Sequence, residues 1–212
     1  MKIKRYGIMG GTFDPIHFGH LVAAEEARAV LGLEYVFFVP SGRPPHKKER
    51  PITKAEHRYL MTVLATATNP SFKVSRVDIT RPGYSYTVDT ISAFREMLGP
   101  DCELYFITGA DAILQILSWK DVDRLFASCY LIAATRPGYD LSQLRASFGA
   151  SWQRYSDKIK TLEVPALAIS SSEIRRRVAA GEPIRYLLPE SVVQYIYKHG
   201  LYGAHRQVKG CI

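Results

Sequence analysis

Residues 10–20 read GGTFDPIHFGH, and this stretch decides the fold. The apolar residues at 3–9 predict a β-strand before it, and the apolar spacing from Leu21 to Leu31 predicts an α-helix after it. A strand that ends in a glycine turn and continues into a helix leaves backbone N–H groups free at the positive end of the helix dipole, which suits phosphate. Because His17 and His20 are three residues apart at the helix start, we expect them to share a face and to point at the bound group.

The alternation of strand and helix continues along the chain. Further strands are predicted at 34–40, 72–79, 103–108, 130–134 and, as a small edge strand, 160–164; helices are predicted at 53–69, 85–99, 141–148, 170–181 and 189–200. Near-continuous apolar strands separated by helices predict a doubly wound, Rossmann-like α/β fold. We expect a mostly parallel sheet of five to six strands, with a helical C-terminal part.

Local signals refine these elements. Thr53 and Glu56 are spaced as a capping box at the start of one helix, and Ser170 and Glu173 repeat that spacing later. Ser118 is expected to cap a short helix that contains Trp119. Ligands of doubly wound sheets bind beyond the carboxyl ends of the strands. The glycine turn, the basic segment SGRPPHKKERPI at 41–52, Gly109 to Asp111 and Arg136 all follow predicted strands.

Length and composition indicate a globular protein. The 212 residues are 47% hydrophobic, and no apolar run is long enough to span a membrane. No continuous apolar stretch follows the basic N-terminus, so we expect no signal peptide. Three cysteines show neither metal nor disulfide spacing, which favours inert core thiols at Cys102 and Cys129 and a cytoplasmic protein. One domain is expected over 1–203, with a flexible tail at 204–212.

The charge distribution favours anionic ligands. The net charge is +8, with 16 Lys and Arg against 14 Asp and Glu in residues 1–135, and 12 against 6 in residues 136–212. Nucleotides, other phosphates and nucleic acid all suit this excess, as does a basic surface that only aids solubility.

Each candidate site residue also has a structural interpretation. His17 and His20 could be metal ligands, structural caps or phosphate ligands; no further set with zinc spacing accompanies them, so the glycine turn favours phosphate. Thr87 could be merely a helix cap, Asp111 merely a first-turn acid, and Trp119 merely a core residue, each without any contact to a ligand. The serines at 170–172 could likewise be a helix cap that contacts no ligand.

Two motifs resemble the two signature motifs of the nucleotidyltransferase superfamily and occur in the same order along the chain. GGTFDPIHFGH resembles its (H/T)xGH signature, and ISSSEIR at 169–175 resembles ISSTxIR, with Ser172 in place of the usual threonine. PPHK at 44–47, SYTVDT at 85–90, GAD at 109–111 and the tryptophan shortly after it narrow the match. Together they resemble the bacterial nicotinate-nucleotide adenylyltransferase family over residues 3–203.

This resemblance implies adenylyl transfer from ATP to nicotinate mononucleotide, giving nicotinate adenine dinucleotide and pyrophosphate in NAD biosynthesis. The acceptor phosphate is already a nucleophile, so direct in-line attack without a covalent enzyme intermediate is expected. Mg²⁺ would be bound mainly through the ATP phosphates, without a metal site of protein ligands. Neither nucleic acid nor a membrane is an expected partner, and a homo-oligomer is compatible with the sequence.

The resemblance also assigns roles to residues. The implied catalytic residues are His17, His20, Lys47 and Arg175. ATP would contact Gly10, Gly11, Thr12, Phe13, His17, His20, Gly109, Asp111, Arg136, Ile169, Ser171, Ser172 and Arg175. Nicotinate mononucleotide would contact Gly11, Thr12, Phe13, His46, Lys47, Thr87 and Trp119, with Trp119 stacked on the ring and backbone amides near it at the carboxylate.

Two other functions compete with this interpretation. Pantetheine-phosphate adenylyltransferase belongs to the same superfamily, but the helical C-terminal third, SYTVDT and Trp119 argue against it. A non-catalytic nucleic-acid-binding protein would use the +8 charge, although the cations are not interleaved with aromatic residues as in an RNA- or DNA-reading module.

Overall fold

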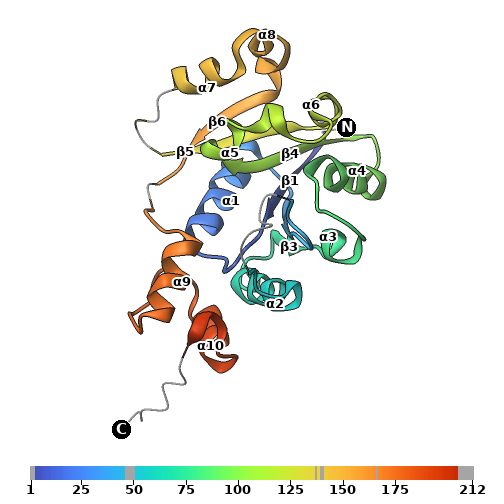
Figure 1. Ribbon diagram of the computed structural model, residues 1–212. Helices are drawn as coiled ribbons and strands as arrows, with labels where there is room; N and C mark the ends of the chain where they lie inside the picture. Colours follow the sequence, from blue (N-terminus) through green and yellow to red (C-terminus); the bar gives the residue numbers. More distant parts are fainter. Residues whose placement is uncertain (1–2, 46–50, 137, 139–140, 166, 205–212) are drawn as a thin grey trace.

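The computed structural model describes residues 3–45, 51–136, 138, 141–165 and 167–204. Within them, six strands form one sheet in the order β3-β2-β1-β4-β5-β6, and every neighbouring pair is parallel (Figure 1). The strands are β1 (Lys4–Gly11), β2 (Tyr35–Pro40), β3 (Phe72–Val74), β4 (Cys102–Gly109), β5 (Tyr130–Thr135) and β6 (Ile159–Glu163). This is the doubly wound Rossmann order, so the predicted fold class is confirmed.

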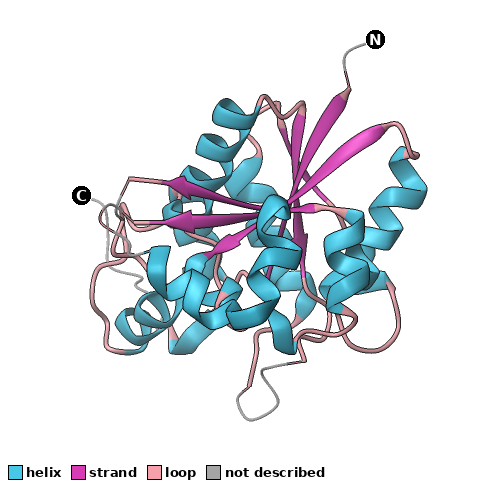
Figure 2. Cartoon of the chain, turned by 90° about the horizontal axis from the view of Figure 1, so that it is seen from above, coloured by secondary structure: helices cyan, strands magenta, loops and turns pink. Residues whose placement is uncertain are grey.

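Helices cover both faces of the sheet (Figure 2). One face packs against α1 (Phe18–Leu31), α2 (Ala55–Thr66), α9 (Ser171–Ala179) and α10 (Glu190–Lys198). The other packs against α4 (Thr87–Leu98), α5 (Ala110–Ile113), α6 (Val122–Ser128), α7 (Leu141–Phe148) and α8 (Trp152–Tyr155). The short helix α3 (Val77–Thr80) joins β3 to α4. The helical C-terminal part is therefore α9 and α10, which extend the first layer.

The strands are apolar on both sides because both sides are covered. In β4, Leu104 and Phe106 belong to the core under α4 and α5, whereas Tyr105 and Ile107 belong to the core under α1. All four side chains are buried. Alternate residues of a strand point to opposite faces, so an uninterrupted apolar run is what a strand between two helical layers requires.

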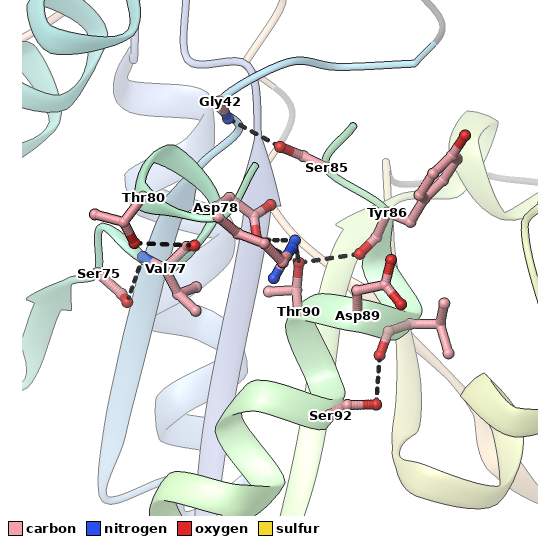
Figure 3. Close-up of polar contacts among 12 residues, drawn as sticks. Gly42, Ser75, Val77, Asp78, Thr80, Ser85, Tyr86, Asp89, Thr90 and Ser92 are labelled. Atoms are coloured by element: carbon pink, nitrogen blue, oxygen red, sulfur yellow. Dashed lines mark hydrogen bonds and ion pairs between the residues drawn. The ribbon is translucent and has the colours of Figure 1, made fainter. Parts of the chain in front are cut away.

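The predicted strand at 72–79 is wrong in its second half. β3 ends at Val74, and Val77–Thr80 forms α3. The Ser75 hydroxyl accepts a hydrogen bond from the Val77 N–H at 3.3 Å, which turns the chain out of the sheet (Figure 3). A local side-chain bond of this kind competes with strand pairing.

Two predicted caps are also wrong. Lys54, not Thr53, precedes α2, and Glu56 pairs with Arg76 instead of closing a capping box. The Ser118 hydroxyl donates to the Gln115 carbonyl at 2.7 Å, so Ser118 ends a 3₁₀ turn rather than capping a helix. Trp119 then lies in extended backbone before α6.

The buried cysteines agree with the expectation of inert core thiols. Cys102 and Cys129 are both free and buried, and burial raises the pKa of the Cys129 thiol to about 12. A thiol that stays protonated is a poor nucleophile. In the described part of the chain, no helix has the length and apolar character that crossing a lipid bilayer would require.

Truncating the α4 core residue should destabilise the fold. Phe94 is completely buried between α4 and the sheet, so Phe94→Ala should lower the free energy of unfolding by about 3–5 kcal/mol. Met97→Ala on the same helix is the matched control, because Met97 is 62% exposed and its loss should have little effect. Urea unfolding measures both; equal losses would contradict the packing described.

Candidate active site

The Phe13 side chain packs against other residues of the turn that follows β1. Phe13 adopts a left-handed backbone conformation with φ of 49°, which is uncommon for a residue other than glycine. Its ring is 2% exposed and lies over Gly11, where an added Cβ would come within 2.9 Å of it. The same ring meets the His20 imidazole edge-on, with centroids 5.1 Å apart. Phe13 thus fixes the turn to the first turn of α1.

The two histidines lie together at the start of α1. His17 is the residue before the helix, and its ring centroid is 3.8 Å from that of His20. The His17 backbone N–H donates to Nδ1 of His20 at 3.3 Å, so a neutral His20 ring carries its proton on Nε2. Gly19 leaves room for this pair, since a Cβ there would lie 3.0 Å from Nδ1 of His17.

His17 is nearly enclosed by the protein. Its side chain is 93% buried, and its Nδ1 atom has no hydrogen-bond partner among the described residues. Burial lowers the pKa of the imidazole to about 4, so the ring is neutral at pH 7. Buried polar atoms normally have partners, and one without a partner beside a cavity is a candidate ligand contact.

Three side chains from two other helices hold the carbonyl groups of this turn. Arg58 of α2, which is 1% exposed, donates to the Thr12 carbonyl at 2.7 Å. Arg175 and Ser171 of α9 donate to the carbonyls of Asp14 at 2.6 Å and Pro15 at 2.8 Å. The C=O and N–H of a peptide unit point in opposite directions, so the Phe13 and Ile16 N–H groups face away from these side chains.

The helix that supplies two of these contacts begins as predicted. The Ser170 hydroxyl accepts the Glu173 N–H at 3.2 Å and caps α9. The Glu173 carboxylate pairs with Arg176 and Arg177. Arg176 and Arg177 lie in the last turn of this short helix, where the helix dipole favours cations.

A first cavity of about 420 Å³ lies beyond β1, β4 and β5, at the start of α9. The predicted site residues that line it are Gly10, His17, His20, Gly109, Asp111, Arg136, Ile169 and Ser171. Imidazoles, a guanidinium and a helix start on one side suit an anion, and the apolar residues Ala23 and Leu167 give it surfaces for a flat ring.

A second cavity of about 340 Å³ adjoins the first. The predicted residues Gly10, Gly11, Thr12, Thr87 and Trp119 line it. Gly10 and Thr108 line both cavities, so the two meet at the carboxyl ends of β1 and β4. The strand order reverses between these strands, which is where ligands of doubly wound sheets bind.

A buried polar network supports the second cavity (Figure 3). The Ser85 hydroxyl accepts the Gly42 N–H at 2.9 Å, and Asp78 accepts hydrogen bonds from Thr90 at 2.7 Å and Arg81 at 2.6 Å. Burial raises the pKa of the Asp78 carboxyl, against the opposing effect of Thr90 and Arg81. Only glycine fits at position 42, because a Cβ would lie 2.3 Å from the Asp78 carbonyl oxygen.

Comparison with known proteins assigns the family. A model of the cytidylyltransferase-like family matches residues 8–177. The probable nicotinate-nucleotide adenylyltransferase of Moorella thermoacetica is 61% identical over 198 residues, covering 93% of this chain and 91% of the relative. That of a Thermoanaerobacter species is 55% identical, covering 93% and 94%. The chain belongs to the nicotinate-nucleotide adenylyltransferase family.

The fold agrees with solved structures of this enzyme class. The nicotinic acid mononucleotide adenylyltransferase of Plasmodium falciparum, solved in complex with NaAD, has a TM-score of 0.76 at 23% identity. The match covers 95% of this chain and 98% of that one. This chain is accordingly a nucleotidyltransferase with the Rossmann-like fold of the family.

Several predicted site residues of this adenylyltransferase family member lie outside both cavity walls. Phe13 packs against His20, and Arg175 donates to the Asp14 carbonyl, so both contact the turn without lining either cavity. Ser172 is in the first turn of α9, 3.3 Å from the Ser170 hydroxyl. His46 and Lys47 fall outside the described residues. Thr87 does not cap α4, because Tyr86 is the residue before the helix and Thr87 is its first residue. Asp111 is a first-turn acid as predicted, and Thr87 and Asp111 each line a cavity.

Sequence reasoning missed other residues of the site. Thr108 lies where the cavities meet, and Tyr86 and Lys120 line the second one. Tyr86 is part of SYTVDT and Lys120 follows Trp119, so their neighbours already pointed to them. Arg58 gave no signal, because an arginine in an amphipathic helix is usually solvated.

The low pKa of His17 makes stability depend on pH. Unfolded His17 has a pKa near 6.5 and the folded ring about 4, so the unfolded chain binds the proton first as the pH falls. The free energy of unfolding should therefore decrease between pH 6.5 and 4, by up to about 3 kcal/mol, and this contribution should then level off. Urea unfolding of the wild type and of His17→Gln at pH 7, 5.5 and 4.5 measures the difference. Identical pH dependence in the two proteins would contradict the burial of a neutral His17.

Proposed function

We propose that this enzyme transfers the adenylyl group of ATP to nicotinate mononucleotide, giving nicotinate adenine dinucleotide and pyrophosphate in NAD biosynthesis. The observation that carries the proposal is the pair of cavities that meet at Gly10 and Thr108, beside His17 and His20. A transfer between two nucleotides requires two adjoining sites with the reacting phosphates at their junction. The activity named for the close relatives supports this choice of substrates.

The first cavity would hold ATP. Asp111 is proposed to bind the ribose, Ile169 and Ser171 the adenine and triphosphate, and Gly109 the adenosine side. Arg136 adds positive charge at the wall, and Ser172 lies beside it in the α9 turn. Arg175 is proposed to act from behind the turn, where it holds the Asp14 carbonyl and adds positive charge near the phosphates.

The second cavity would hold nicotinate mononucleotide. Trp119 lines it with its ring edge-on to Phe106, at a centroid distance of 6.1 Å, which leaves a flat face for stacking on the pyridine ring. Thr87 begins α4, whose free N–H groups suit the carboxylate of the ring. Gly11, Thr12 and the turn at Phe13 would adjoin the phosphate. His46 and Lys47 are assigned to the phosphates from the family resemblance alone.

The reaction needs charge stabilisation rather than a base. The 5′-phosphate of the mononucleotide attacks the α-phosphorus of ATP in line, and the bond from that phosphorus to the pyrophosphate oxygen breaks. His20 is oriented by the His17 N–H so that its Nε2–H can donate to an oxygen that gains charge in the transition state. His17 is neutral and would donate through an imidazole N–H.

The residues present fit a magnesium ion that arrives with ATP. Among the described residues, no group of three or more histidine, cysteine, aspartate or glutamate side chains could hold a metal ion, and Asp111 is the carboxylate that lines the first cavity. Mg²⁺ is commonly held by substrate phosphates and water with few protein ligands. When bound, it would neutralise phosphate charge. We also propose a cytoplasmic location, which suits the free thiols of Cys102 and Cys129.

A paired turnover assay tests the substrate assignment. The purified enzyme is given ATP with nicotinate mononucleotide or with phosphopantetheine, and pyrophosphate release is measured. Turnover should require the mononucleotide. Turnover with phosphopantetheine alone would replace the proposal by pantetheine-phosphate adenylyl transfer, and salt-sensitive RNA binding without turnover would point to the nucleic-acid-binding alternative.

Removing the His20 imidazole should slow the reaction without unfolding the protein. His20→Ala should lower kcat by about 10²-fold or more, because a donor to the transition state is lost. His57→Ala is the matched control: His57 bonds Tyr195 on α10 and lines neither cavity, so kcat should stay near the wild-type value. Near-normal turnover of His20→Ala, with unchanged urea unfolding, would remove His20 from the mechanism.

A further inference from the structure

We infer that Lys120 is a specificity-determining residue that makes the second cavity select nicotinate mononucleotide over its amide, nicotinamide mononucleotide. The inference rests on the proposed function, because it concerns which mononucleotide enters that cavity. The two molecules differ only in the group on the pyridine ring: a carboxylate in one, a neutral carboxamide in the other. Backbone N–H groups can bind the carboxylate, and a cation near the ring would add to the preference for it over the neutral amide; Lys120 follows Trp119 and lines the same cavity.

The Lys120 ammonium is held in place beside the start of α4. Its Nζ lies 3.1 Å from Oδ2 of Asp89 and 4.6 Å from the centroid of the Tyr86 ring. Tyr86 is the residue before α4 and Asp89 is in its first turn, and both lie at the same end of the helix in Figure 3. A cation fixed by an ion pair and a ring face loses less side-chain entropy when it meets a ligand than a free lysine would.

The charges around Lys120 leave a positive excess. Asp89 accepts from Lys120 through Oδ2 and from Arg124 through Oδ1, at 3.2 Å, so one carboxylate faces two cations. Asp78, the carboxylate that lines this cavity, is paired with Arg81 and accepts a hydrogen bond from Thr90. These five charged groups, two carboxylates and three cations, together have a net charge of +1; of the three cations, Lys120 is the one that lines the cavity, and the dipole of α4 adds positive potential there.

The two cations that pair with Asp89, Lys120 and Arg124, differ in their position relative to the cavity. Lys120 precedes α6 and lines the cavity, whereas Arg124 lies within α6 and is not part of the cavity wall. If the ion pairs only braced α4 against α6, either cation would serve equally. If the charge at the wall selects the acid, only Lys120 should matter for the choice between the two mononucleotides.

The test compares Lys120→Gln with Arg124→Gln. For each variant and the wild type, kcat and KM are measured with ATP and either mononucleotide, and binding of each mononucleotide is measured by calorimetry. Because Lys120 is partly exposed, Lys120→Gln should lower the acid-to-amide preference by about fivefold. The change should be in KM and in the dissociation constant for the acid, with kcat and the affinity for the amide nearly unchanged. Arg124→Gln should keep the wild-type preference, and Lys120→Arg should restore most of it.

The outcomes distinguish the inference from the proposed function. Equal weakening of both mononucleotides by Lys120→Gln, or the same change in preference with Arg124→Gln, would show that Lys120 only supports the structure. A wild-type enzyme that adenylates neither mononucleotide would overturn the proposed function, and this inference with it. Urea unfolding of each variant confirms that the comparison is made between folded proteins.

Discussion

The hydrogen bonds from Arg58, Ser171 and Arg175 to the carbonyls of the turn at 12–15 are the interactions on which the rest of the site depends. A sharp turn between a buried strand and a helix has too few backbone partners of its own. Each donor comes from a helix distant in sequence, so the hydrogen bonds to the turn form only when α2 and α9 lie beside it. Folding of the C-terminal part is thereby linked to formation of the site.

Burial supplies the electrostatic character of the site. The Arg58 guanidinium is almost completely enclosed, and that burial lowers its pKa while three carbonyls accept its hydrogen bonds. His17 is kept neutral by the same effect. A phosphate in the first cavity would meet fixed dipoles and positive charge. Such preorganisation is worth more in an enclosed site than at an exposed surface.

The sequence was sufficient for the features that depend on local pattern. The apolar runs predicted a mostly parallel sheet of five to six strands and located five of the six observed strands closely, the exception being the end of β3; the spacing of Ser170 and Glu173 located the start of α9. The sequence did not predict the structure correctly where a tertiary contact overrides a local signal. Thr53 has good capping chemistry, but its carbonyl accepts Arg58 and the helix begins later. The position of Lys120 after Trp119 placed it near the predicted site, but its ion pair with Asp89, 31 residues away in the chain, could not be read from the sequence.

Arg58 also affects how far the basic segment at 41–52 can vary in length. Its guanidinium donates to the carbonyls of both Gly42 and Thr53, at 3.2 and 2.8 Å, so one buried side chain joins the two ends of that segment. The free energy needed to close a loop grows only slowly with its length once its ends are held together. A change in the number of residues between these anchors should therefore have little effect on the stability of the sheet. Evolution or a protein engineer can adjust the approach to the phosphates there while the catalytic turn stays the same.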